Sequence, residues 1–152
     1  MDLGFLKGNR LVILGIGNRI KGDDAVGSLV AEGLQGNENV LVVDCEDVPE
    51  NFKSRILEFE PDAILMVDAV DFKGGAGDIH VFELGGESPA TRTTHKISLK
   101  ALAYSLKQET MAEIYLIGVQ PKSIEFGDEM CAEVEGARKK VLDYLTTNLL
   151  SR

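Results

Sequence analysis

What is scarce in this sequence excludes several classes of protein. The chain has 152 residues but only two cysteines, Cys45 and Cys131, which are too few and too far apart for a disulfide framework or a zinc knuckle. It lacks the run of about 18 apolar residues that a membrane-spanning helix needs. Its first residues include an acid and no long apolar stretch, so a signal peptide is not expected. A reducing cytoplasm is the location that we expect.

Basic residues are also few. The chain has 16 lysines and arginines against 25 aspartates and glutamates, which gives a net charge of -9. Nucleic acids and anionic membranes need clustered basic side chains, so neither is expected as a partner. The charge instead favours a positively charged partner or a bound cation. Hydrophobic residues make up 44% of the chain and charged residues 27%, and we expect residues 1–152 to form a single globular domain.

The order of apolar patterns predicts the fold class. Short apolar runs predict strands, and apolar residues at helical spacing predict helices between them. The expected strands are residues 11–14, 40–43, 63–67, 79–84 and 114–119, and the expected helices are 25–34, 51–59, 98–108 and 130–149. Strands separated by helices imply a largely parallel sheet that is covered on both faces. We therefore predict an α/β protein with a three-layer α/β/α arrangement.

Acidic residues and one histidine follow the predicted strands. Asp23 and Asp24 come after the first strand, Asp68 ends the third, and His95 precedes the helix at 98–108. Ligands of open parallel sheets bind beyond the carboxyl ends of the strands, where these residues are expected to meet. Two carboxylates and an imidazole suit a divalent transition metal such as nickel, zinc or iron. They could equally form an acid–base pair.

Each of these residues also has a purely structural interpretation. Capping of the following helix would account for one member of the pair Asp23 and Asp24, and Asp68 could be a turn residue. The other histidine, His80, lies in the expected edge strand and is less well placed than His95. Cys45 has no adjacent activating base, so we expect it to be a packed thiol.

A glycine-rich loop after the first strand also raises the possibility of a nucleotide site. A dinucleotide fingerprint has a third glycine where this chain has Ile20, and acids at the helix start would repel phosphate. The features therefore disfavour a nucleotide-binding module.

The motifs together resemble those of the hydrogenase maturation proteases. Residues 15–27 resemble the family's opening motif of Gly-x-Gly-Asn, a pair of acids and a glycine three residues on. Residues 66–70, around Asp68, match its second acidic motif, and residues 94–99, around His95, resemble its histidine segment. Residues 117–121 and the helix beginning near Met130 resemble its C-terminal half, so the resemblance covers nearly the whole chain.

The resemblance implies both a fold and an activity. The fold would be phosphorylase/hydrolase-like, with a five-stranded, mixed, mostly parallel sheet and residues 79–83 as its antiparallel strand. The activity would be that of an endopeptidase, classified as aspartic-type, which removes a C-terminal extension from the precursor of a nickel–iron hydrogenase large subunit after nickel insertion. The family's metal-contacting and catalytic positions correspond to Asp24, Asp68 and His95. The nickel would be supplied by the precursor, and no organic cofactor is implied.

Two other functions would use the same residues. A non-enzymatic metallochaperone for a hydrogenase subunit could use the same three ligands. An ordinary aspartic peptidase could use Asp24 and Asp68 as a carboxylate dyad, which predicts an acidic pH optimum. In the maturation protease, Gly15, Gly17 and the glycines of residues 74–77 would let the backbone approach the inserted substrate tail closely.

Overall fold

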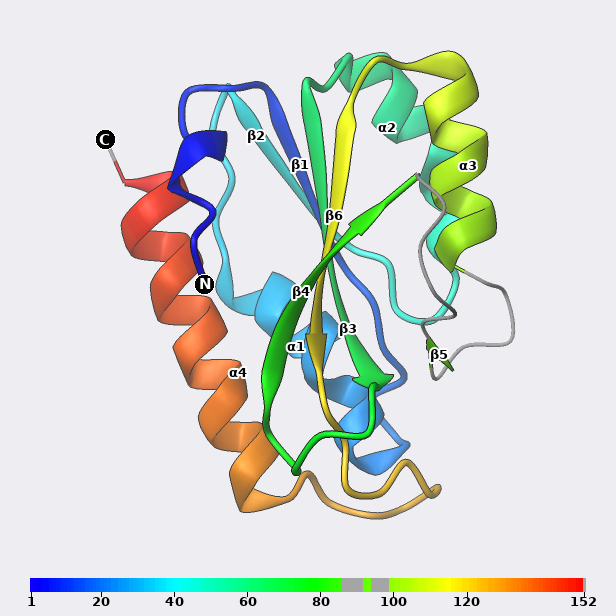
Figure 1. Cartoon of the computed structure of the whole chain (residues 1–152), viewed down its shortest axis with the longest axis vertical. Coiled ribbons are helices and arrows are strands. Elements are labelled where there is room, and N and C mark those ends of the chain that lie inside the picture. The colour runs from blue at the N-terminus through cyan, green and yellow to red at the C-terminus, as the bar shows by residue number, and fades with distance from the viewer. Residues whose placement is uncertain (86–91, 94–98, 152) are drawn as a thin grey trace.

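The structure, a computed structural model, describes residues 1–85, 92–93 and 99–151 and has a central sheet between two layers of helices (Figure 1). The sheet's main path runs in the order β2-β1-β3-β6-β4. Its strands are β1 (Leu11–Gly15), β2 (Val40–Asp44), β3 (Ala63–Asp71), β4 (Ile79–Leu84) and β6 (Glu113–Val119). Among the described residues, no helix is long and apolar enough to cross a membrane.

Strand directions match the expectation for the sheet. The pairs β1–β2, β1–β3 and β3–β6 are parallel, whereas β4 runs antiparallel to β6, with Ile79 opposite Val119. The predicted five-stranded mixed sheet, with the strand at 79–83 antiparallel, is therefore confirmed. A two-residue strand, β5 (Arg92–Thr93), was not predicted and pairs antiparallel with Val70 and Asp71 of β3.

Helices cover the two faces of the sheet as predicted. The helices α1 (Val26–Gly33) and α4 (Ala132–Leu145) pack on one face, and α2 (Lys53–Phe59) and α3 (Leu99–Glu109) pack on the other (Figure 1). The shorter helical turns are η1 (Gly4–Leu6), η2 (Gly22–Ala25), η3 (Pro49–Phe52) and the π-helical η4 (Thr146–Leu150). Each face has its own apolar core, which is the three-layer arrangement expected from the sequence.

The third strand is longer than predicted. The sequence pattern ended it near Asp68, but β3 continues to Asp71. Pairing explains the difference, because Asp68 lies opposite Gly118 of β6 and Val70 lies opposite Thr93 of β5. Asp68 is therefore inside a strand and fully buried rather than in a turn.

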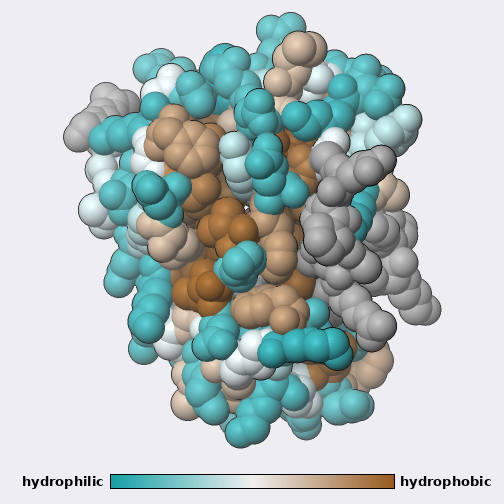
Figure 2. All heavy atoms as spheres, viewed as in Figure 1, coloured by the Kyte–Doolittle hydropathy of each residue, from teal (hydrophilic) through white to brown (hydrophobic). Residues whose placement is uncertain are grey.

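The edge strand β4 is the most open part of the sheet. Figure 2 shows apolar side chains gathered along the middle of the face over β4 and β6. On β4, Ile79, Val81 and Phe82 are half-buried, whereas His80 and Glu83 are exposed. Polar side chains on an edge strand disfavour pairing with another chain.

Candidate functional site

Close packing of η2 and the start of α1 against the sheet gathers acidic residues at one edge. The backbone N–H of Ile16 donates to the carbonyl oxygen of Val67 at 2.9 Å, and a Cβ atom on Gly27 would lie 2.0 Å from that same oxygen. Only glycine therefore lets the chain pack this closely. Asp24 lies in η2, which contacts β3, and Asp68 follows Val67 on β3. Both acids thus lie at the carboxyl edge of the sheet, as predicted.

The carboxylates of Asp24 and Asp68 are both buried. Asp24 is 1% exposed and Asp68 is 0% exposed. The backbone N–H of Asn18 donates to Asp24 Oδ2 at 3.1 Å, the N–H of Ala69 donates to Asp68 Oδ1 at 2.8 Å, and both residues make further interactions. Burial of a charged group costs free energy unless partners compensate it. Two such groups at the carboxyl edge are unlike ordinary surface acids.

His95, the third predicted site residue, lies outside the described residues. The last described residue before His95 is Thr93, which pairs with Val70 of β3. Over residues 1–85, 92–93 and 99–151, no three histidine, cysteine, aspartate or glutamate side chains are grouped so that they could hold a metal ion. The meeting of His95 with the two acids stays a prediction.

Asp23 braces two loops that are far apart in the sequence. Its Oδ2 atom accepts hydrogen bonds from the backbone N–H groups of Lys122 at 2.7 Å and Ser123 at 3.1 Å. Its Oδ1 atom accepts one from the N–H of Cys131 at 2.8 Å, and the Cys131 thiol lies 3.3 Å from Oδ2. Burial by itself would raise the pKa of Asp23, but the backbone hydrogen bonds outweigh it and lower the pKa below its usual value.

The expectation that an acid of this pair caps the following helix is wrong. Neither η2 nor α1 has a side-chain capping hydrogen bond. Asp23 instead turns toward residues 122–131, which no local pattern could have indicated.

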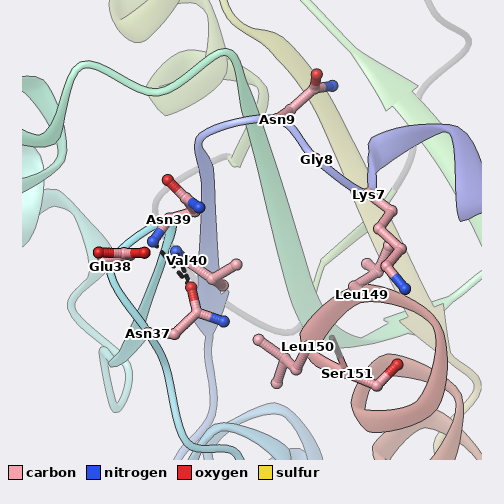
Figure 3. A pocket seen from close by; sticks show the side chains of 10 residues that line it. All are labelled: Lys7, Gly8, Asn9, Asn37, Glu38, Asn39, Val40, Leu149, Leu150 and Ser151. Atoms are coloured by element: carbon pink, nitrogen blue, oxygen red, sulfur yellow. Dashed lines mark hydrogen bonds between the residues drawn. The ribbon is translucent and has the colours of Figure 1, made fainter.

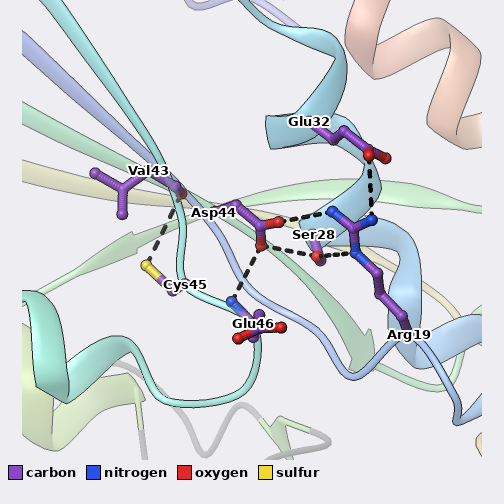
Figure 4. A network of polar contacts seen from close by, with 7 residues as sticks. All are labelled: Arg19, Ser28, Glu32, Val43, Asp44, Cys45 and Glu46. Atoms are coloured by element: carbon purple, nitrogen blue, oxygen red, sulfur yellow. Dashed lines mark hydrogen bonds and ion pairs between the residues drawn. The ribbon is translucent and has the colours of Figure 1, made fainter.

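A second polar network fixes the loop that carries the opening motif (Figure 4). The Arg19 guanidinium donates to Ser28 Oγ at 2.9 Å and pairs with Asp44 at 2.7 Å and Glu32 at 3.2 Å. Ser28, which is fully buried, donates to the other Asp44 oxygen at 2.7 Å. Hydrogen bonds to Glu32 and Asp44 raise the pKa of Arg19. Sequence reasoning missed this network, because it joins residues of three separate segments.

Gln120 organises the loop after β3 and was also missed as a candidate residue. Its side-chain oxygen accepts the N–H groups of Phe72 at 2.9 Å and Gly74 at 3.0 Å, and its amide donates to Asp71 at 3.1 Å. Gln120 is 7% exposed, so this side chain belongs to the interior of the loop.

The glycines near the site pack against the protein's own backbone. A Cβ atom on Gly15 would lie 2.2 Å from the carbonyl oxygen of Gly27, and one on Gly17 would lie 2.1 Å from that of Asp24. Gly77 has a φ of +83°, and its Cβ atom would lie 2.5 Å from the carbonyl oxygen of Glu133. Folding itself therefore requires glycine at positions 15, 17 and 77, and the approach of a substrate tail to these glycines stays a prediction.

Cys45 is a packed thiol, as expected. It is 0% exposed, and burial together with the charges of Asp44 and Glu50 raises its pKa to about 12. A thiol that stays protonated is a poor nucleophile. Cys45 therefore does not serve as a catalytic nucleophile at neutral pH.

A separate hollow lies at the opposite edge of the sheet, near the amino ends of β1 and β2 (Figure 3). Its volume is about 320 Å³. Three asparagine side chains, Asn9, Asn37 and Asn39, line it together with the C-terminal Leu149 and Leu150. Among the described residues that line it, Glu38 is the one acid, so this hollow lacks the paired carboxylates found at the carboxyl edge.

Comparisons with known proteins agree with this fold and motif order. A family model described as hydrogenase maturation protease matches residues 25–148. The hydrogenase 3 maturation protease of Escherichia coli K12 is 31% identical over 137 residues, which cover 88% of this chain and 87% of that protein.

Solved structures give the same result. The crystal structure of a NiFe hydrogenase maturation protease from Thermococcus kodakarensis KOD1 has a TM-score of 0.90 and 31% identity, and covers 99% of this chain and 100% of that one. The solution structure of an endopeptidase from Escherichia coli has a TM-score of 0.76 and 28% identity, and the match covers 90% of this chain and 89% of that one. The chain therefore belongs to the hydrogenase maturation protease family and is a peptidase.

Proposed function

We propose that this peptidase removes a C-terminal extension from the precursor of a nickel–iron hydrogenase large subunit after nickel has been inserted. The observation that carries the proposal is the pair of buried carboxylates, Asp24 and Asp68, at the carboxyl edge of the sheet in a member of this family. The names of its relatives, a hydrogenase 3 maturation protease and a NiFe hydrogenase maturation protease, support this substrate class. The two free cysteines fit a reducing cytoplasm.

In this proposal, Asp24, Asp68 and His95 contact the nickel that the precursor carries. Carboxylate oxygens and an imidazole nitrogen are suitable ligands for a divalent transition metal. Because the precursor supplies ligands of its own, three protein donors complete a coordination sphere rather than hold an isolated ion. The metal is therefore part of the substrate, and the same contact selects nickel-loaded precursor over empty precursor.

Peptide hydrolysis then needs a base, an acid and a polarised carbonyl. A site carboxylate takes a proton from the attacking water as the new C–O bond forms, and the C–N bond breaks as a proton passes to the leaving amine. Either the nickel or a protonated carboxylic acid of the site polarises the scissile carbonyl. Burial of Asp24 and Asp68 strengthens their electrostatic interactions with a bound substrate, because the surrounding dielectric constant is lower than that of water.

Peptidase chemistry is favoured here over a non-enzymatic metallochaperone. The relatives found by sequence and those found by structure are named as proteases or as an endopeptidase. A chaperone would leave the mass of the precursor unchanged, whereas the proposed reaction lowers it by the mass of the removed extension.

The test is the intact mass of a large-subunit precursor incubated with this protein, with and without nickel. The variants Asp24→Asn, Asp68→Asn and His95→Ala are each expected to abolish cleavage of the nickel-loaded precursor. Glu38→Gln is the matched control, because it changes an exposed carboxylate at the opposite edge of the sheet. Full cleavage by Asp24→Asn or Asp68→Asn would overturn the assignment, and cleavage regardless of nickel would favour an ordinary aspartic peptidase.

A further inference from the structure

We propose that Ile20, Lys21 and Phe126 form a docking surface on which the large-subunit precursor places an apolar side chain flanked by basic residues. The inference rests on the proposed function, since the occupant is the substrate of that reaction. The surface is defined by two bulky apolar side chains that the fold leaves uncovered. Ile20 is 63% exposed and Phe126 is 70% exposed.

The two apolar residues lie side by side although they are far apart in the sequence. The backbone N–H of Gly127 donates to the carbonyl oxygen of Ile20 at 2.9 Å. Lys21 Nζ lies 5.3 Å from the centre of the Phe126 ring, within the range of a cation–π interaction. The loop after β1 and the loop after β6 therefore join to make one surface.

The docking surface is held rigidly by contacts below it. The carboxylate of Asp23 accepts hydrogen bonds from the backbone of Lys122, Ser123 and Cys131, and its own N–H donates to the carbonyl oxygen of Ser123 at 2.9 Å. A Cβ atom on Gly22 would lie 2.7 Å from that same oxygen. A rigid surface loses less conformational entropy on binding, so its apolar area contributes more to affinity.

The docking surface is continuous with the proposed catalytic site. The N–H of Asp24 donates to the carbonyl oxygen of Lys21 at 3.0 Å, and Asn18 of the same loop donates to the Asp24 carboxylate. A polypeptide that covers Ile20 therefore lies within a few residues of the proposed catalytic acid. Single exposed apolar side chains are ordinary on protein surfaces, but two on hydrogen-bonded neighbouring loops beside a site indicate binding.

Charges around Phe126 indicate the chemistry of the occupant. Three acids, Glu125, Asp128 and Glu129, are all exposed on the same loop and outnumber the two lysines beside them, Lys122 and Lys21. The whole chain is also acidic, with a net charge of -9. These acidic surroundings favour a segment that carries lysine or arginine next to its apolar side chain. A second copy of this acidic chain would be repelled at the same place.

The test is the steady-state kinetics of cleavage of nickel-loaded precursor by Ile20→Ser, Phe126→Ser and the double variant. Met111→Ser is the matched control, because Met111 is 96% exposed and precedes β6 at the opposite edge of the sheet. We expect the double variant to raise KM by roughly tenfold, as for a binding hot spot, with kcat within about twofold of the parent. Met111→Ser is expected to leave both constants unchanged.

The outcomes separate this inference from the proposed function. Absence of cleavage by the parent protein would refute the proposed function itself. Cleavage by the parent with an unchanged KM in the double variant would overturn the docking surface alone, as would a fall in kcat without a rise in KM. A dimer in sedimentation that the substitutions dissociate, with KM unchanged, would assign the surface to a second copy instead and also overturn the inference.

Discussion

Substitution of Asp23 by asparagine tests whether this acid is a structural brace rather than a catalytic group. In the folded protein its two oxygens accept backbone N–H groups from Lys122, Ser123 and Cys131. Asparagine keeps one acceptor oxygen and places an NH₂ group where the other oxygen was, so at least one N–H donor would face another donor.

The expected loss of stability follows from these contacts. A hydrogen bond to a charged group contributes about 1.5–3 kcal/mol, and a buried donor left unsatisfied adds a penalty of similar size. We therefore expect Asp23→Asn to lower the free energy of unfolding by about 3 kcal/mol. For a chain of this length, that change corresponds to a fall in Tm of roughly 6–12 °C.

The pH dependence supplies a second test of the same contact. The folded-state pKa of Asp23 lies below its usual value of 3.8, so its charged form is stabilised by folding. This contribution is present above the unfolded pKa and is lost as the pH falls through the folded pKa. The stability difference between the parent and Asp23→Asn should therefore be constant near neutral pH and shrink below about pH 4.

The assay is urea unfolding of both proteins between pH 3 and pH 7, followed by circular dichroism. Glu129→Gln is the matched control, because Glu129 is an exposed acid on the same loop, and it should leave stability unchanged. Equal stability of Asp23→Asn and the parent at pH 7, or a difference that widens in acid, would refute the reasoning.

Three further predictions concern the packing around the site. Gly27→Ala should destabilise the protein by roughly 3 kcal/mol in urea unfolding, because its Cβ atom would lie 2.0 Å from a carbonyl oxygen of β3; unchanged stability would contradict this packing. Iodoacetamide at pH 8 should spare Cys45 in the folded protein, since burial and nearby acids raise its pKa to about 12, and mass spectrometry of digested peptides would detect any labelling. Arg19→Lys should lower activity with little loss of stability, because lysine cannot bridge Ser28, Asp44 and Glu32 together; full activity would show that the network does not position the loop.

Much of the sheet could be predicted from the sequence, because buried parallel strands are continuous apolar runs. All five residues of β1 are buried. Arg10 precedes the strand, and the glycine loop follows it. The strand β5 could not be predicted, since two residues carry no periodic pattern and are a strand only through pairing with β3. The strand β3 is longer than predicted because Asp68 interrupts the apolar run, whereas Ala69 and Val70 beyond it are buried and paired with neighbouring strands.

The candidate site was predictable in its position but not in its details. Crossover topology places Asp24 and Asp68 at one edge of the sheet, and both lie there. The contacts of Asp23 could not be read from the sequence, because they are made to backbone N–H groups of residues 122–131. His95 remains predicted from its motif alone.

The most direct test of the central claim compares Asp23→Asn, Asp68→Asn and Glu38→Gln in the cleavage of nickel-loaded large-subunit precursor, measured by intact mass. We expect Asp68→Asn to lower kcat by about 100-fold or more while the protein stays folded, since general acid–base groups contribute at least that much. The Asp23→Asn variant should cleave the precursor at temperatures below its own Tm. The Glu38→Gln variant should cleave the precursor at the parent rate. Cleavage by Asp68→Asn at the parent rate would contradict the account.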